Sequence, residues 1–83
     1  MKELVVFMAT NLVDDSYQVK VVQRGGSRST VIELTVAPQD MGRVIGKSGR
    51  VANAMRALVN VAAARQGKQI ILDIVDPEEG RSR

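Results

Sequence analysis

Hydrophobic residues recur at helical spacing in two parts of the chain. The segment 3–13 predicts a helix near the N-terminus, because its apolar residues fall on one helical face: Leu4, Val5, Met8 and Leu12. A second helical segment follows Gly49 and ends at Gly67, a residue type that commonly stops helices. We expect its apolar stripe to contain Val51, Met55, Leu58, Val59 and Ala62. A separate face carries Asn53, Arg56 and Asn60.

Three other segments predict β-strands. The segments 17–24 and 30–36 alternate between apolar and polar residues, which is typical of strands with one buried face. The glycine-rich stretch 25–29 predicts a flexible hairpin connection, so these two strands should pair antiparallel. The apolar segment 69–75 predicts the third strand. Two helices join it to 30–36, a connection long enough for a right-handed crossover, so these strands should be parallel neighbours.

A short helix is predicted before Gly46. Pro38 stops the second strand and suits the first turn of a helix, where the helix dipole favours the acidic Asp40. The order of elements is therefore α-β-β-α-α-β, which predicts an α+β fold with a three-stranded mixed sheet and helices on one face. The open face of the sheet should carry a small apolar patch that could serve as a contact surface: Val22, Val31 and Val75.

The length of the chain allows one domain at most. We expect this domain to span residues 1–77 and residues 78–83 to form a flexible C-terminal tail. The pair Asp14-Asp15 is interpreted as the signal that ends the first helix. No apolar run approaches the roughly 20 residues that a membrane span needs, and the N-terminal stretch lacks a cleavage signature. These features predict a cytoplasmic protein without membrane insertion.

The composition excludes several kinds of chemistry. The chain has no Cys and no His, which removes disulfides, thiol nucleophiles, histidine acid–base catalysis and most zinc sites. We expect no enzymatic activity, no metal and no cofactor. Phe7 and Tyr17 are the only aromatic residues, so the core must be aliphatic.

The positive charge is concentrated in the middle of the chain. Between Lys20 and Lys68, nine basic residues oppose two acidic ones, a net charge of +7, while the remaining segments together carry −4. This distribution suits a partner that bears phosphates, although a solvated basic surface would give the same count.

The stretch "GRVIGKSGR", Gly42 to Arg50, allows two interpretations. A nucleotide-binding P-loop needs four residues between its glycines, because the backbone must wrap around the phosphates. Here three residues separate Gly42 from Gly46, and Met41 occupies the position of the first glycine. A P-loop also follows a strand, whereas this stretch follows a predicted helix. The P-loop interpretation is therefore disfavoured.

The alternative is a glycine-framed turn between two helices, Gly46-Lys47-Ser48-Gly49. Glycines two residues apart let the backbone turn tightly and approach another backbone closely. The first amides of the following helix then point outward at its positive dipole end, where Lys47 adds a charge and Arg43 and Arg50 flank it. Such a site holds sugar-phosphate by charge and amides. A plain corner between helices would use the same glycines.

The segment 37–59, "APQDMGRVIGKSGRVANAMRALV", resembles the core of KH domains. The element order resembles the bacterial type II arrangement. The short length and "DMGRVIGKSGR" make the chain similar to the small single-domain KhpA-like (YlqC-like) family of bacterial KH RNA-binding proteins. The resemblance covers residues 2–76.

This resemblance implies single-stranded RNA binding, with a role as an RNA chaperone or post-transcriptional regulator. It also implies a homodimer or a heterodimer with a KhpB/Jag-like KH protein, and a link to cell elongation and division, and so to cell shape and cell wall organization. It places Gly46, Lys47, Ser48 and Gly49 on the phosphates, and Val44, Ile45 and residue 52 along a nucleobase groove. KH domains usually carry a large aliphatic residue at that last position, so Ala52 predicts a shallower groove.

Two hypotheses remain for the function. In the first, the loop grips RNA, and bases lie in an aliphatic groove between the loop, the following helix and the strand 30–36. Asn53 and Arg56 would then contact RNA or stay solvated. About three phosphate contacts would give a salt slope near −2, and without aromatic platforms binding should be weak and tolerant of sequence. In the second, the protein mainly docks another protein.

Overall fold

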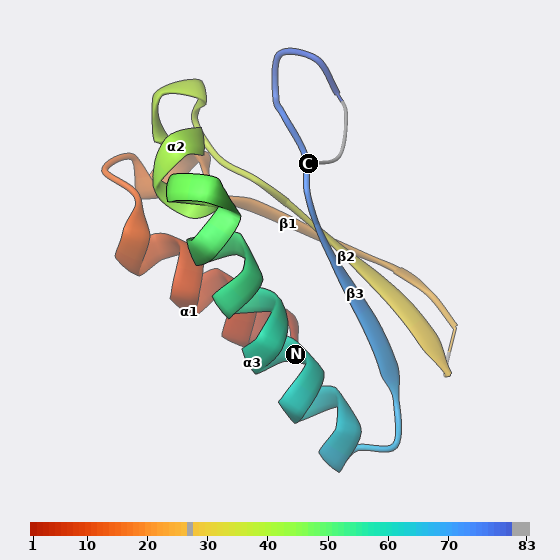
Figure 1. Cartoon of the computed structure of the whole chain (residues 1–83). Helices are drawn as coiled ribbons and strands as arrows, with labels where there is room; N and C mark the ends of the chain where they lie inside the picture. The colour runs from red at the N-terminus through yellow and green to blue at the C-terminus, as the bar shows by residue number, and fades with distance from the viewer. Residues whose placement is uncertain (27, 81–83) are drawn as a thin grey trace.

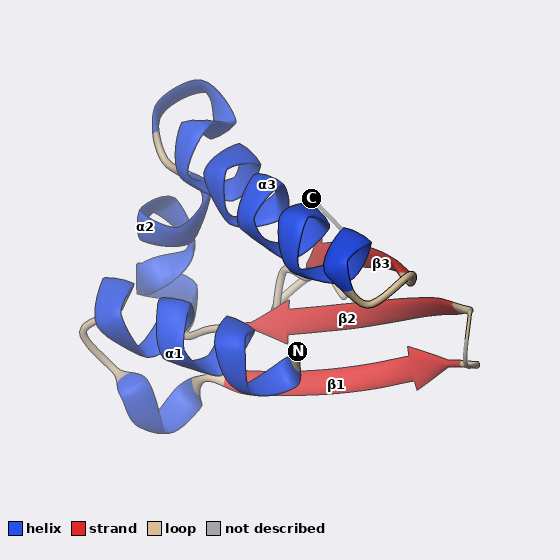
Figure 2. Cartoon of the chain, turned by 90° about the horizontal axis from the view of Figure 1, so that it is seen from below, coloured by secondary structure: helices blue, strands red, loops and turns tan. Residues whose placement is uncertain are grey.

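Three helices lie together on one face of a three-stranded sheet (Figures 1 and 2). This computed structural model describes residues 1–26 and 28–80. The order α-β-β-α-α-β is confirmed, with three short 3₁₀ turns between the main elements. The helices and strands are α1 (Lys2–Leu12), β1 (Lys20–Gly25), β2 (Ser29–Thr35), α2 (Met41–Ile45), α3 (Arg50–Arg65) and β3 (Gln69–Ile74).

The sheet is mixed, as the connections predict. Its order is β1-β2-β3, so β2 is the central strand and β1 and β3 form the two edges. β1 pairs antiparallel with β2, with Val21 opposite Leu34. β2 pairs parallel with β3, with Ile32 opposite Leu72. Helix α1 lies over β1, and α3 runs along β3, so the core is sealed between the helices and one face of the sheet (Figure 2).

The core is aliphatic and sits between these two layers. Its sheet side is contributed by alternating residues of the three strands: Val21, Ile32, Leu34, Ile70, Leu72 and Ile74. On the helix side, α3 buries Ala52, Met55, Val59 and Ala63. The predicted stripe was therefore partly wrong, because Leu58 is 55% exposed and Val51 and Ala62 are only half-buried. The alanines on the buried face leave room for the helix to approach the sheet closely.

Asp40 is a fully buried charged residue at the junction between the helices and the sheet. Its two carboxylate oxygens accept the backbone N–H groups of Asp14 and Asp15, each at 3.1 Å. The Nε atom of Arg43 lies 3.4 Å from one of the same oxygens. The predicted role of Asp40, as a helix-dipole residue, was too narrow. The carboxylate fastens the connection after α1 to the residues that begin α2.

The first strand starts later than predicted. Residues 17–19 were expected in the strand, but Ser16–Gln18 form a 3₁₀ turn and β1 begins at Lys20. Two hydrogen bonds close this turn. The backbone N–H of Gln18 donates to the carbonyl of Asp15, and the side-chain amide of Gln18 donates to the Asp15 carboxylate at 2.7 Å. The chain needs this turn because it must reverse direction between α1 and the sheet.

The ends of the last elements agree with their sequence signals. After α3, Gly67 adopts a positive φ of 65°, and the N–H groups of Gly67 and Lys68 bond to the carbonyls of Ala64 and Ala63. This is the Schellman arrangement that glycine favours at a helix end. After β3, the Asp76 carboxylate accepts the N–H of Glu78. The predicted tail 78–83 and hairpin connection 25–29 include residues 81–83 and 27, which lie outside the described residues.

The open face of the sheet is less apolar than predicted. Val22 is 38% exposed on it, and Ile71, which the sequence pattern did not single out, is 46% exposed. Arg24 and Glu33 form an ion pair on the same face, 3.1 Å apart, and Asp73 of β3 is the register partner of Glu33. Charged side chains therefore interrupt the apolar patch. No helix in the described part of the chain has the length and hydropathy to cross a membrane.

Replacing Asp40 with Ala should lower the free energy of unfolding by about 2–3 kcal/mol, because two backbone N–H groups lose their buried acceptor. Urea denaturation followed by circular dichroism measures this change. Gln39→Ala, at an exposed neighbouring position, is the matched control and should change stability by less than about 0.5 kcal/mol. Equal stability of the two variants would contradict a fastening role for Asp40.

Candidate nucleic-acid interface

The loop between α2 and α3 depends on a close approach at Gly46. Gly46 has a φ of 75°, a region that L side chains rarely adopt. A Cβ atom placed there would lie 2.5 Å from the Cγ2 atom of Val51 and 2.8 Å from its backbone nitrogen. Only glycine fits this position, because its backbone packs directly on the first turn of α3. Gly42, by contrast, has open space around it.

The rest of the loop turns the backbone toward solvent. Ser48 and Gly49 both have positive φ values, 56° and 77°, and the N–H of Gly49 donates to the carbonyl of Gly46 at 3.1 Å. A left-handed conformation at Ser48 is strained, since its side chain crowds the backbone. Gly49 is the N-cap of α3 and supplies no side-chain acceptor. The first amides of α3 therefore have no side-chain cap, and that of Arg50 donates to the backbone carbonyl of Lys47.

Three of the predicted phosphate-contacting side chains surround these amides. Lys47, Ser48 and Arg50 are exposed. Within the described part of the chain, neither Lys47 nor Arg50 forms an ion pair. The first turn of α3 contains no acidic residue. A positive charge and the positive end of a helix dipole therefore coincide at the loop.

Arg43 differs from the other cations because it already has carboxylate partners. Its Nη2 atom lies 3.0 Å from the Asp14 carboxylate, and its Nε atom lies 3.4 Å from that of Asp40. Arg43 lies beside the loop as predicted, three residues before Gly46. Its guanidinium is not free for a phosphate in this structure. Asp14 was interpreted only as a helix-ending signal, and this ion pair across 29 residues has no local sequence pattern.

The side of α3 that carries Asn53 and Arg56 faces the edge of β3. Arg56 donates from Nε to the carbonyl oxygen of Leu72 at 3.2 Å and from Nη1 to the side chain of Asn53 at 3.4 Å. The structure therefore brings these two predicted residues together beside the loop. The strand 30–36 was predicted to border the groove for bases. This was wrong, because that strand is β2, which is central in the sheet and hydrogen-bonded on both sides. The free strand edge next to α3 belongs to β3.

The predicted aliphatic lining of the groove is mostly core. Val44 is fully buried and Ala52 is 4% exposed, contrary to their predicted contact with bases. Both face the sheet because α2 and the start of α3 turn their apolar sides inward. Ile45 and Val51 are half-buried and pack against the core cluster from outside. The small side chain of Ala52 thus allows close packing of the helix and does not set the depth of a groove.

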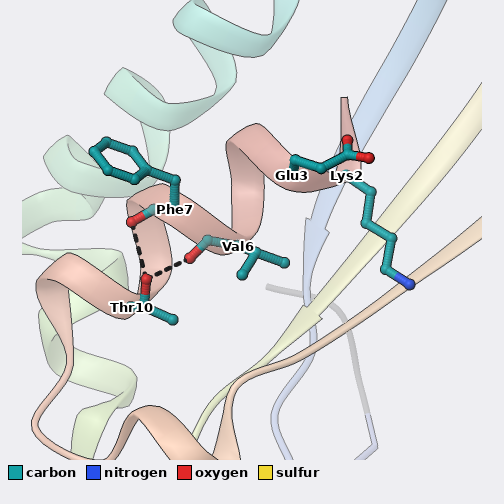
Figure 3. A pocket seen from close by; sticks show the side chains of 5 residues that line it. All are labelled: Lys2, Glu3, Val6, Phe7 and Thr10. Carbon is teal, nitrogen blue, oxygen red and sulfur yellow. Dashed lines mark hydrogen bonds between the residues drawn. The ribbon is translucent and has the colours of Figure 1, made fainter.

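A separate hollow of about 530 Å³ lies on the exposed side of α1 (Figure 3). It is lined by Lys2, Glu3, Val6, Phe7 and Thr10, and the Thr10 hydroxyl donates to the carbonyls of Val6 and Phe7. The pKa of Glu3 is lowered, because the carboxylate accepts a backbone hydrogen bond and pairs with the N-terminal ammonium 3.2 Å away. All the residues that line this hollow come from α1, so the hollow encloses no small-molecule site.

A second hollow of about 320 Å³ lies between α1 and α3 and is almost wholly apolar. Phe7 and Leu58 line it from the two helices, and they are 67% and 55% exposed. Val61, one turn after Leu58, is 59% exposed. We call Phe7, Leu58 and Val61 with this hollow the α1–α3 patch. Large apolar side chains exposed together in this way are typical of contact surfaces.

The arrangement of the loop excludes the P-loop interpretation. The loop follows a helix, α2, whereas a phosphate-wrapping P-loop follows a strand. Among the described residues there is also no cluster of acidic side chains that could hold a metal ion. What the loop offers an anion is the positive dipole end of α3, which has no side-chain cap, and two cations, Lys47 and Arg50, that form no ion pair with the described residues.

Comparisons with known proteins agree with this geometry. Residues 2–74 match the family model described as "KhpA/KhpB, KH domain". A protein named "RNA-binding protein KhpA" from Caldanaerobacter subterraneus subsp. tengcongensis is 49% identical over 75 residues, which cover 90% of this chain and all of that protein. Proteins of the same name from Clostridium perfringens and Aquifex aeolicus are 45% and 38% identical, with 90% and 92% of this chain and 100% and 96% of theirs covered. A comparison with solved structures gives no significant match.

Two glycine substitutions test the loop geometry. Gly46→Ala should lower the free energy of unfolding by at least about 2 kcal/mol, because the new Cβ meets Val51 and the positive φ disfavours alanine. Gly42→Ala is the matched control, in a helix and without a clash, and should raise stability by roughly 0.5–1 kcal/mol. Thermal melting of both variants measures the difference, and a stable Gly46→Ala variant would show that the loop backbone is not held against α3.

Proposed function

The chain belongs to the KhpA/KhpB family of KH domains, and we propose that it binds single-stranded RNA through the loop 46–49. The family is one of KH domains and not of enzymes. The observation that carries the proposal is the coincidence at one place of an uncapped helix N-terminus, a glycine-framed turn and the unpaired cations Lys47 and Arg50. The relatives' name, RNA-binding protein, supports the same conclusion.

The loop would hold the sugar-phosphate backbone. Its glycines remove side chains from the turn, so a phosphate can approach the backbone of the turn and the positive dipole end of α3. The Ser48 hydroxyl can donate a further hydrogen bond, and Lys47 and Arg50 supply the neutralising charge. None of these groups distinguishes one base from another, so they set affinity and position and leave sequence preference to other contacts.

Bases would lie beside the loop, between the start of α3 and the edge of β3. Asn53 and Arg56 are the polar side chains that face this edge, and both can exchange their present hydrogen bonds for bonds to a base. Ile45 and Val51, half-buried beside the loop, offer an apolar contact. No aromatic side chain is available there for stacking, because Phe7 and Tyr17 lie on other elements. Binding by one domain should therefore be weak and tolerant of sequence.

The charge geometry lowers the expected number of phosphate contacts from three to two. Lys47 and Arg50 are unpaired, whereas Arg43 is engaged by Asp14 and Asp40. With roughly 0.7 for each contact to a single strand, the logarithm of the affinity should fall with the logarithm of salt at a slope of about −1.4.

Replacing Lys47 and Ser48 with Asp should weaken binding to a mixed single-stranded RNA pool by at least about tenfold, because two acidic groups then face the phosphates. Fluorescence anisotropy at several salt concentrations measures affinity and slope together. Gln66→Asp with Lys68→Asp gives the same change in charge beyond the far end of α3 and should lose much less. Unchanged RNA affinity in a folded loop variant would refute the proposed site.

The apolar surface supports a pairing function beside RNA binding. We infer that the α1–α3 patch docks a second KH domain, either another copy of this chain or a KhpB/Jag-like partner. It combines exposed large apolar side chains from two helices with a hollow that can receive a side chain. It contains no residue of the loop 46–49, but Val51 lines the hollow and also lies beside the loop, so the docked domain would sit next to the bound strand. Two linked loops would raise the affinity for one strand through effective concentration.

A substitution in the patch should disrupt self-association. Leu58→Glu should shift sedimentation at high protein concentration toward the monomer, because a charge would be buried in an apolar contact. Ile71→Glu, on the open face of the sheet, is the control, since it adds the same charge to a comparably exposed apolar residue. Loss of self-association in Ile71→Glu but not in Leu58→Glu would place the contact on the open face of the sheet. A wild-type protein that sediments as a monomer at every concentration would restrict pairing to a different KH protein.

Weak and sequence-tolerant binding suits an RNA chaperone, which must bind many strands and release them. A chaperone or regulatory role in the cytoplasm is therefore part of this proposal. The link to cell elongation, cell shape and cell wall organization stays a prediction from the family resemblance.

A further inference from the structure

Arg43 stands close to the proposed phosphate site but is held by an acidic residue from another part of the chain. It lies in the last turn of α2, three residues before Gly46, which corresponds to about 4.5 Å of helix rise. Its Nη2 atom lies 3.0 Å from the carboxylate of Asp14, in the connection that follows α1. The ion pair therefore joins a residue beside the loop to a segment that takes no part in the proposed RNA contact.

This ion pair is not needed to hold the connection in place. The backbone N–H groups of Asp14 and Asp15 already bind the buried Asp40 carboxylate, and substitution of either side chain leaves those N–H groups intact. The Asp14 and Arg43 side chains are 75% and 55% exposed, so water and salt reach the pair. Exposed pairs of this kind contribute little to stability and exchange partners readily.

A phosphate is a direct competitor for the same guanidinium. Carboxylate and phosphate oxygens both match the planar donors of arginine, and either can take two parallel hydrogen bonds. The contact between Arg43 Nε and Asp40 at 3.4 Å fixes the inner part of the side chain and leaves the outer nitrogens as the exchangeable donors. Asp14 and an RNA phosphate therefore compete for the same atoms.

We propose that Asp14 weakens RNA binding by occupying Arg43, so that a third phosphate contact is withheld while the ion pair is intact. This inference rests on the proposed RNA-binding function. It assigns Asp14 a role in setting affinity, although Asp14 contacts no RNA itself. RNA binds more tightly whenever Asp14 loses its charge, and the gain passes through Arg43.

The test compares Asp14→Asn with Asp15→Asn. Both variants remove one negative charge from the same connection and keep the backbone bond to Asp40, but the Asp15 side chain bonds to Gln18 and not to Arg43. Affinity for a fluorescent mixed-sequence single-stranded RNA is measured by anisotropy across a salt series. Asp14→Asn should bind about fivefold tighter than Asp15→Asn at about 0.1 M salt, with a slope steeper by about 0.7, as one added phosphate contact requires.

Arg43→Gln locates the effect. In combination with Asp14→Asn it should abolish the gain, because the third contact no longer exists. Thermal melting of each variant checks that the fold is kept. The comparison of Asp14→Asn with Asp15→Asn remains decisive even if Arg43→Gln does not fold.

The outcomes separate this inference from the function on which it rests. Equal affinity and slope for Asp14→Asn and Asp15→Asn would overturn the competition while leaving RNA binding in place. Weaker binding by a folded Asp14→Asn variant would overturn it too, because the ion pair would then support the loop. A wild-type protein that does not bind the RNA pool at any salt concentration would remove the proposed function and the inference together.

Discussion

The buried carboxylate of Asp40 is the constraint on which the placement of the loop depends. A charge removed from water is costly unless hydrogen bonds replace its hydration, and here the backbone N–H groups of Asp14 and Asp15 do so, with Arg43 nearby. Helix α2 has only five residues, too few to hold its orientation by its own hydrogen bonds. Fastening its start to the end of α1 therefore fixes the direction in which it delivers the chain to Gly46.

After Gly46, the glycine turn determines where α3 begins and which groups its N-terminus presents. Because Gly46 packs its backbone directly on Val51, α3 begins immediately after the loop, and no side chain caps its N-terminus. A side chain at Gly46 would collide with Val51, and one at Gly49 would require a residue other than glycine to adopt a left-handed backbone conformation. The strained left-handed conformation of Ser48 fits this view, since strain is retained where the surrounding structure requires a particular exposure of the backbone. The same contacts therefore hold the fold together and set the geometry of the candidate site.

Local sequence patterns predicted most of the fold and the centre of the site. Periodicity and the glycine and proline signals gave the element order, the mixed sheet and the loop 46–49, and the family resemblance drawn from residues 37–59 is confirmed. One failure is local, since contacts between Asp15 and Gln18 form a turn where the first strand was expected. The others involve partners distant in sequence. Spacing could not show that Arg43 pairs with a residue 29 positions earlier, that Val44 turns into the core, or that the edge facing α3 belongs to β3.

The same limitation affects any argument from charge. Counting along the chain assigns the middle segment a strong positive excess and treats every arginine near the loop as equivalent. In three dimensions an acidic residue from outside that segment neutralises Arg43, whereas Lys47 and Arg50 have no acidic partner within the described residues. A phosphate meets only the charge that is not already paired. The pairing pattern, more than the net charge, therefore determines how many counterions RNA binding releases and how steeply affinity falls with salt.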